Sequence, residues 1–335
     1  MHVSTASKAW LHLKCPSWHK VPRPEVVGTV GERALFGTYI HKIAQNELLR
    51  QTGQPTGSVI SDKMTAEQEA AFNPHYTPEI GAPFDAEEWG NNVFRMVEEL
   101  RGLFPELVWE AEIAFGIGLT EDGIVGDLVS DVKDRNYNAI DEDCIPGTID
   151  VLGYKWRYKK EDGSIPPCLV VVDWKTGEEE VEPKDNPQLY LAARAAIRHY
   201  TFPHDTEVYV GIGNIRKNTL KFHKASVAEL NRVVLDVLQF KNRDGLVLNP
   251  GDHCARCPNQ EKCPALSRKI LENPVPPEQW TADQLAIAAI QARDLGKKYR
   301  ELLIHKAESD PSFKTKYLKK GSQGWRLSVF EGQKE

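Results

Sequence analysis

Two acidic residues and a lysine are the side chains with the clearest chemical potential in this chain. Asp150 lies in the segment GTIDVLGY (147–154), and Asp173 and Lys175 close the segment CLVVVDWK (168–175). Two carboxylates held close together repel each other, and a divalent cation relieves that repulsion. Hard oxygen ligands favour Mg²⁺ or Mn²⁺. A lysine beside such a cation can orient an attacking water or neutralise charge that develops on a phosphate.

The D-W-K triplet also has a plainer interpretation, in which a strand simply reaches solvent and ends on charged residues. Its context argues for a metal site. A G-x-I-D strand precedes it, Thr176-Gly177 forms a turn after it, and a helix beginning Asn186-Pro187-Gln188 comes next. If the two strands are neighbours in one sheet, Asp150 and Asp173 meet at one end of it, with Lys175 on the same side. The two carboxylates can then share one cation.

Four of the six cysteines form a second candidate site. Cys254, Cys257 and Cys263 are spaced as C-x2-C-x5-C, and Cys15 stands near the start of the chain before a proline. Four thiolates suit either a [4Fe–4S] cluster or Zn²⁺, and spacing does not choose between them. A third interpretation is that these are ordinary buried or reactive cysteines. A shared centre would close a very long loop, so its binding energy would contribute to folding.

Length and charge set outer limits on the fold and its partners. The chain has 335 residues, enough for one large domain or two, and a formal net charge of −6. This acidic balance argues against phosphate binding over the whole surface, although it allows a local basic groove. Part of the acid is concentrated in residues 122–143 and 178–185.

The sequence contains no run of about 18 apolar residues and no basic-then-apolar start. We therefore expect a cytoplasmic protein with no membrane segment, placed in the host cytoplasm if the chain is phage-encoded. Thiols stay reduced in that compartment, where grouped cysteines more often bind a metal than form disulfides.

Hydrophobic periodicity and helix-capping signals predict the elements that position these residues. The nearly apolar segment 168–174 is typical of a central strand buried on both faces. Residues 51–84 are polar and rich in Gly and Pro, and are expected to form an insertion or loop. The elements together predict an α/β fold, a mixed sheet flanked by helices. Helices are expected at 4–18, 35–49, 85–100, 187–200, 226–240 and 282–306, and strands at 107–115, 147–154, 168–174, 207–213 and 219–223.

Four segments, in this order, resemble one known family. GTYIH (ending at His41), GTIDVLGY, VVVDWKTG and NPQLYLAA are similar to motifs I to IV of the RecB-like branch of the PD-(D/E)xK nuclease superfamily. The opening STASKAWLHLKCPSW and the later C-x2-C-x5-CP match its iron–sulfur members, such as AddB-type nucleases and CRISPR-associated adaptation nucleases. Related proteins are frequent in phage genomes. The resemblance covers residues 4–266 and implies a restriction-endonuclease-like core.

The resemblance implies a role for each matching residue. His41, Asp150 and Asp173 would bind the metal, with the backbone carbonyl of Trp174 as a further ligand. Lys175 would be the catalytic lysine. Gln188 would act with these catalytic residues by helping to place Lys175 or the substrate.

One position departs from the family pattern. The branch carries a tyrosine four residues after the motif IV glutamine, whereas this chain has Ala192 there and Tyr190 two residues earlier. Tyr190 is expected to point elsewhere on the helix, which leaves the DNA-positioning part of motif IV unassigned. By the same resemblance the cysteine centre is a [4Fe–4S] cluster, with Zn²⁺ as the alternative, held by Cys15, Cys254, Cys257 and Cys263.

These expectations combine into one function. The chain is expected to be a DNA nuclease that uses Mg²⁺ or Mn²⁺ and acts as an exonuclease on single-stranded or end-containing DNA. It would serve recombination, repair or phage DNA metabolism. Residues 1–266 would form the nuclease domain, closed by the cysteine cluster, and residues 267–335 a helical extension. Because the sequence shows no helicase motif, any helicase or recombination partner is expected to be a separate chain.

Two other functions fit the same residues. The fold can be a catalytically silent module that is kept for DNA binding or assembly. The intact set of Asp150, Asp173 and Lys175 argues for the enzyme, since a retired site would be expected to have lost one of them. A sequence-specific endonuclease would need a base-reading element, which the sequence does not identify.

Overall fold

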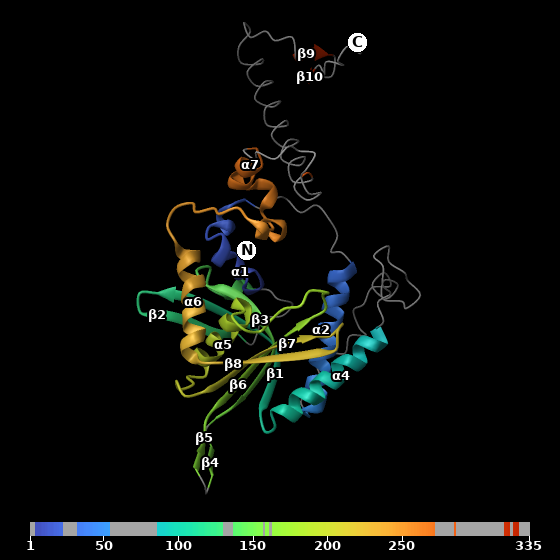
Figure 1. Cartoon of the computed structure of the whole chain (residues 1–335), viewed down its shortest axis with the longest axis vertical. Helices are drawn as coiled ribbons and strands as arrows, with labels where there is room; N and C mark the ends of the chain where they lie inside the picture. Colours follow the sequence, from blue (N-terminus) through green and yellow to red (C-terminus); the bar gives the residue numbers. More distant parts are fainter. Residues whose placement is uncertain are drawn as a thin grey trace. The chain divides into compact units, whose positions relative to one another are not determined.

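A six-stranded mixed sheet forms the centre of the first part of the chain (Figure 1). The computed structural model describes residues 4–22, 32–53, 86–129, 137–156, 158–160, 163–271, 285, 318–321 and 324–327. It divides into two units, Met1–His19 with Val26–Val247, and Lys20–Glu25 with Leu248–Glu335. Most of the insertion expected at 51–84 and nearly all of the helix expected at 282–306 lie outside the described residues. The domain boundary after residue 266 stays a prediction.

The sheet runs in the order β2-β1-β3-β6-β7-β8. Neighbouring strands are antiparallel except for the parallel pair β6 and β7, which confirms the predicted mixed sheet. The strands are β1 (Val108–Thr120), β2 (Gly123–Val129), β3 (Ile145–Lys155), β6 (Cys168–Lys175), β7 (Glu207–Asn214) and β8 (Thr219–Ala225).

Strand β6 is buried on both faces, as its apolar sequence predicts. Val170 and Val172 face the helices α2 (Glu32–Gln51) and α4 (Ala86–Leu103), whereas Leu169 and Val171 face the helices α5 (Pro187–His199) and α6 (Val227–Asn242). The two helix pairs therefore cover opposite faces of the sheet (Figure 1). Asp173 follows Val172 and lies on the face of α5, two residues before Lys175 on the same face.

Local sequence signals explain where the helices begin and which sides they bury. Ile40, Ala44 and Leu48 are all fully buried along one side of α2, at the predicted helical spacing. Asn186 caps α5, because its side-chain oxygen accepts the backbone N–H groups of the second and third helical residues, and Pro187 occupies the first turn. The Ser226 hydroxyl caps α6 by accepting the backbone N–H of Glu229, the third helical residue.

Strand β1 does not keep the alternation that the sequence suggests. Trp109 and Ala111 pack on the face of α2 and α4, but Ile113 packs on the face of α5 and α6. The change of face occurs at Glu112, whose φ of 54° is in the left-handed region. The ladder pairs Ala111 with Val151 and Ile113 with Ile149, so Glu112 and Asp150 are the residues between those pairs.

Three further segments differ from the predicted elements. Residues 122–143 contain the edge strand β2, joined to β1 by a tight turn that ends at Gly123 with a φ of 115°. The charged residues of this segment obscure the sequence pattern of the strand. The short hairpin of β4 (Tyr158–Lys160) and β5 (Gly163–Ile165) lies between two predicted strands, where the sequence predicts no strand. The helix expected at 4–18 is broken into Ala6–Lys8, α1 (Trp10–Lys14) and Trp18–Lys20.

The second unit joins residues near the start of the chain to the cysteine-rich segment. Val21 packs with Cys254, Cys263 and Leu266, and its backbone carbonyl accepts a hydrogen bond from Asn259 Nδ2 at 3.0 Å. The described elements of this unit are the turns Asp252–Arg256 and Gln260–Lys262, the helix α7 (Pro264–Leu271), and the strand pair β9 (Leu318–Gly321) and β10 (Gly324–Leu327). Among the described residues, no helix has the length and apolar character needed to cross a membrane.

Candidate metal and catalytic site

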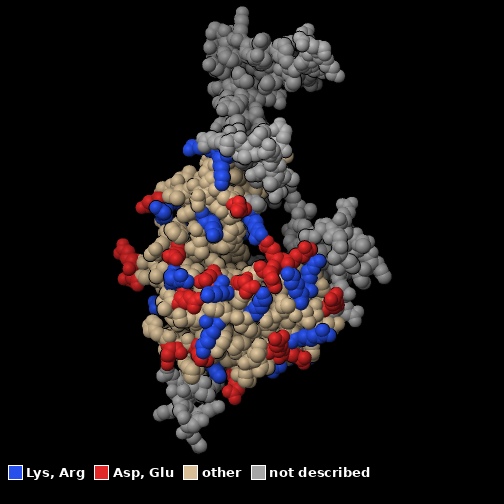
Figure 2. Space-filling view, viewed as in Figure 1, with Lys and Arg blue, Asp and Glu red and all other residues tan. Residues whose placement is uncertain are grey.

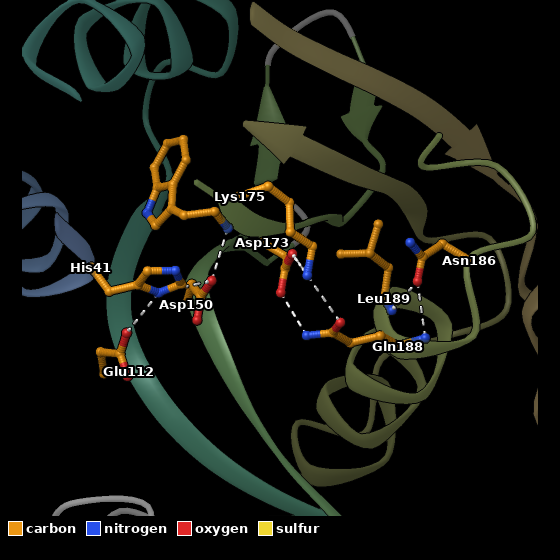
Figure 3. A network of polar contacts seen from close by, with 9 residues as sticks. His41, Glu112, Asp150, Asp173, Lys175, Asn186, Gln188 and Leu189 are labelled. Atoms are coloured by element: carbon orange, nitrogen blue, oxygen red, sulfur yellow. Dashed lines mark hydrogen bonds and ion pairs between the residues drawn. The ribbon is translucent and has the colours of Figure 1, made fainter. Parts of the chain in front are cut away.

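Three side chains from three different elements meet above the middle of the sheet (Figure 3). His41 comes from α2, Glu112 from β1 and Asp150 from β3, and one ligand atom of each lies within 4.8 Å of the others. His41 Nδ1 is 3.4 Å from Asp150 Oδ2 and 3.7 Å from Glu112 Oε1. In the part of the chain that the structure describes, this is the one group of three such residues at that spacing.

The backbone places each of these side chains by a different means. The left-handed conformation of Glu112 brings its carboxylate to the α2 side of the sheet, where His41 lies. Gly37, one turn before His41, allows α2 to approach Thr176 closely, since a Cβ at this position would lie 3.2 Å from Thr176 Oγ1. The tight contact explains why a glycine occupies this position of the GTYIH segment.

Asp150 is tied to the strand that carries Asp173. Its Oδ2 accepts a hydrogen bond from the backbone N–H of Trp174 at 2.8 Å. The ladder between β3 and β6 ends with the pair Val151 and Val172, and Asp150 and Asp173 are the next residue of each strand beyond that pair. Both carboxylates are buried, with exposed fractions of 4% and 6%.

Asp173 belongs to a second set of contacts beside the first (Figure 3). Its Oδ1 accepts a hydrogen bond from Gln188 Nε2 at 2.5 Å, and its Oδ2 lies 2.6 Å from Lys175 Nζ. Lys175 Nζ also donates to Gln188 Oε1 at 3.3 Å. The Gln188 amide thus presents its oxygen to the cation and its nitrogen to the anion, which fixes the orientation of both.

Burial and charge act in opposite directions on the two titrating groups of the site. Burial lowers the pKa of His41, but the carboxylates of Asp150 and Glu112 outweigh it and raise that pKa to about 10. Burial also raises the pKa of Asp173, an effect that Lys175 opposes and the charge of Asp150 reinforces. Without a bound cation, a protonated His41 balances the carboxylates around it.

The donor set fits a hard divalent cation. Two carboxylates and one imidazole from neighbouring elements supply mainly oxygen ligands, as Mg²⁺ and Mn²⁺ prefer. Two buried atoms, His41 Nδ1 and Asp173 Oδ2, have ion-pair contacts but no well-directed hydrogen bond within the described part of the chain. A cation that replaced the proton of His41 would give this nitrogen a partner.

The structure places the sequence-predicted residues in two connected groups. His41 and Asp150 lie together, whereas Asp173, Lys175 and Gln188 form the adjoining network. Trp174 joins the two through its backbone N–H. The roles assigned to these residues, including the Trp174 carbonyl as a metal ligand, stay predictions.

Glu112 is the residue of this group that the sequence does not single out. Its alternation with Trp109 and Ala111 predicts a carboxylate on the outer face of a strand. One signal was available, namely two glutamates inside an otherwise apolar strand. They separate in the structure, because Glu110 accepts hydrogen bonds from the hydroxyls of Tyr154 and Tyr200.

The cysteines are divided between the two units. Cys15 belongs to the first unit, whereas the other three of the candidate set belong to the second. In the second unit, Cys254 Sγ accepts the backbone N–H of Gly251 at 3.3 Å and Cys263 Sγ accepts that of Leu266 at 3.5 Å. None of the six cysteines, all of which the structure describes, forms a disulfide.

The fold and this site together define a class of protein. An α/β core that presents carboxylates and a lysine from neighbouring strands is that of a metal-dependent nuclease. The family model of the PD-(D/E)XK nuclease superfamily matches residues 6–264, and the chain therefore belongs to this superfamily. Metal-dependent cleavage of phosphodiester bonds is the chemistry of the class.

Other comparisons add little. None of the curated proteins matches the sequence. A solved structure described as "Crystal structure of SSO0001" is similar at 10% sequence identity and a TM-score of 0.26, over 68% of this chain and 85% of that chain. At this TM-score the likeness bears on neither fold nor function.

Proposed function

We propose that this protein is a DNA nuclease of the RecB-like branch that hydrolyses phosphodiester bonds with bound Mg²⁺ or Mn²⁺. The observation that carries the proposal is the meeting of two groups. The His41, Glu112 and Asp150 group offers a cation site, and the network of Asp173, Lys175 and Gln188 adjoins it. The protein is expected to act as an exonuclease on single-stranded or end-containing DNA.

Each side chain has a defined task in this proposal. The cation, when bound, polarises the scissile phosphate and lowers the pKa of a water molecule. His41, Glu112 and Asp150 hold one side of that cation, and Asp173 supplies an oxygen from the neighbouring strand. Hydrogen bonding to Trp174 keeps Asp150 from turning away.

Lys175 is the positively charged catalytic side chain in this proposal. Its Nζ, held between Asp173 Oδ2 and Gln188 Oε1, can orient the attacking water or stabilise the charge that develops on the phosphate. Gln188 keeps the ammonium in that place, since its amide also bonds Asp173.

The charges on one face of the protein support a local rather than a spread-out DNA contact there. On the face shown in Figure 2, Lys and Arg side chains are interspersed with Asp and Glu. Lys221, for example, pairs with Glu180 and Glu182, and Arg216 pairs with Glu178. DNA is therefore expected to bind mainly at the catalytic groups. We also propose that the protein acts with a helicase or recombination partner. Its place would be in recombination, repair or phage DNA metabolism.

The four-cysteine centre is a separate part of the proposal and rests on the sequence. We expect Cys15, Cys254, Cys257 and Cys263 to hold a [4Fe–4S] cluster, with Zn²⁺ as the alternative. Backbone N–H groups point at the sulfurs of Cys254 and Cys263. The centre is expected to be structural. A cytoplasmic location also stays a prediction.

The test is a cleavage assay with anaerobically purified protein. Labelled single- and double-stranded DNA would be incubated with Mg²⁺ or Mn²⁺, beside the variants Asp173→Ala and Lys175→Ala. Cleavage by the wild type that falls at least about a hundredfold in both variants supports the enzyme. Equal cleavage by all three proteins overturns it. DNA binding without any cleavage identifies a silent nuclease-like module instead.

A further inference from the structure

The hydroxyl of Tyr190 joins two segments that the catalytic network does not itself connect. It accepts a hydrogen bond from the backbone N–H of Asp185 at 3.0 Å and donates one to Glu229 Oε1, on α6, at 2.9 Å. The Tyr190 side chain is fully buried, and burial raises its pKa, so the hydroxyl stays protonated and able to donate. His223 Nε2 contacts the same oxygen of Glu229 at 3.0 Å.

Asp185 needs such a partner because its backbone is in a disfavoured conformation. Its φ of 54° lies in the left-handed region, which residues other than glycine adopt at a cost. The Asp185 carboxylate pairs with Arg232 at 3.1 Å, but both side chains are exposed and such pairs contribute little. The part-buried bond to the Tyr190 hydroxyl is therefore the stronger restraint on this residue.

The conformation of Asp185 sets the start of α5. The next residue, Asn186, caps the helix by accepting the N–H groups of Gln188 at 3.0 Å and Leu189 at 3.4 Å. Gln188 is only the second residue of the helix, so the cap fixes the backbone that carries its side chain. Any shift of Asp185 moves the amide that bridges Asp173 and Lys175.

We infer that Tyr190 is a positioning residue, which orients Gln188, and through it Lys175 and Asp173, by holding Asp185 and the α5 cap against Glu229. The inference rests on the proposed function for its effect on catalysis. It also gives Tyr190 a task within motif IV other than contact with DNA, in agreement with its burial.

A double-mutant cycle on cleavage tests the inference. Tyr190→Phe removes only the hydroxyl and is expected to lower kcat about ten- to a hundredfold with little change in KM, because misplaced groups slow the chemical step. In a Gln188→Ala background the same change is expected to lower kcat by less than about twofold, since its route to the site is gone. Equal effects of Tyr190→Phe in both backgrounds would overturn the inference.

Tyr200→Phe is the matched control. Tyr200 also donates a hydroxyl to a carboxylate, that of Glu110 at 3.0 Å, but at the far end of α5. This variant is expected to keep the kcat of the wild type. A fall in kcat as large as that of Tyr190→Phe would show that loss of any such hydroxyl in this region impairs the protein, and would count against the inference.

Hydrogen exchange separates this inference from the proposed function, since it needs neither metal nor DNA. In Tyr190→Phe the backbone amides of Gln188 and Leu189 are expected to exchange at least about tenfold faster than in the wild type, and in Tyr200→Phe at the wild-type rate. If the wild type cleaves no DNA but these rates change, the proposed function fails and the positioning role stands. Unchanged rates in Tyr190→Phe would overturn the positioning role, whatever the activity.

Discussion

The backbone N–H of Trp174 donates a hydrogen bond to Asp150 Oδ2, and this one contact of 2.8 Å joins the two halves of the candidate site. Asp150 also lies beside His41 and Glu112, and these three residues form the candidate cation site. Trp174 stands between Asp173 and Lys175, which contact Gln188. Movement of β3 against β6 would therefore separate the metal ligands from the catalytic lysine.

We predict that cation binding depends on pH through His41. Its pKa is raised from 6.5 to about 10, so the ion pair with Asp150 and Glu112 stabilises the metal-free protein fully below pH 6.5 and is lost as pH rises through about 10. A metal-bound imidazole must be neutral, so the cation displaces this proton. Mn²⁺ affinity is expected to rise up to about tenfold per pH unit between these values.

Calorimetry in buffers of different ionisation enthalpy measures the protons released when Mn²⁺ binds. About one proton per cation is expected from the wild type near pH 7.5. In His41→Gln that release should disappear and the affinity should lose its pH dependence. An affinity of the wild type that stays constant from pH 6.5 to 9 would contradict this account.

We predict that Glu112 contributes to cation binding and strains the backbone in doing so. Glu112→Gln is expected to weaken Mn²⁺ binding about ten- to a hundredfold without a change of fold. Glu112→Gly should lose the same affinity, yet unfold at a higher temperature than Glu112→Ala, because glycine accepts a φ of 54° without strain.

Glu110→Gln is the matched control for Glu112, two residues earlier in β1. Its carboxylate bonds Tyr154 and Tyr200, so the change is expected to leave Mn²⁺ affinity as it is. Titration calorimetry gives the affinities, and thermal unfolding without metal gives the order of the Gly and Ala variants. A Glu112→Gln protein that binds Mn²⁺ as tightly as Glu110→Gln would exclude Glu112 from the site.

We predict that Gly213 is required beneath the catalytic strand. It pairs with Trp174 across β6 and β7, and a Cβ there would lie 2.1 Å from the Trp174 ring. Gly213→Ala is expected to cost about 1–3 kcal/mol of unfolding free energy through overpacking. Gly177→Ala, where a Cβ meets nothing within 4 Å, should cost less than about 0.5 kcal/mol. Denaturant unfolding compares the two, and equal losses would show that the Trp174 contact is unimportant.

We predict that the cysteine centre contains iron. Anaerobically purified protein should be brown and carry about four iron and four sulfide per chain. Cys15→Ala and Cys257→Ala are each expected to lose the colour and to lower the melting temperature, whereas Cys144→Ser should keep both. Zinc in place of iron would establish the alternative, and unchanged metal content and stability in both alanine variants would remove the centre from the account.

Local signals were sufficient for much of the fold. The apolar run of β6, the Asn186-Pro187 start of α5 and the helical spacing of Ile40, Ala44 and Leu48 depend on neighbours in sequence, and all are found as predicted. Such periodicity predicts the face of the sheet on which a residue lies only while the strand stays regular.

The part of the site that sequence did not predict depends on distant contacts. Glu112 adopts a left-handed conformation that its residue type disfavours, so no local pattern indicates that β1 changes face there. Likewise the orientation of Gln188, on α5, follows from charges on strand β6. The bond from Tyr190 to Glu229 joins two residues that are 39 positions apart in sequence. Such features are decided by tertiary packing.

Anomalous scattering from crystals soaked with Mn²⁺ tests the central claim most directly. The account predicts one strong peak within about 2.0–2.4 Å of carboxylate oxygens from both Asp150 and Asp173, with His41 as a further ligand. No peak at the sheet, or a peak bound only elsewhere, such as at the exposed acidic residues 141–143, would contradict it.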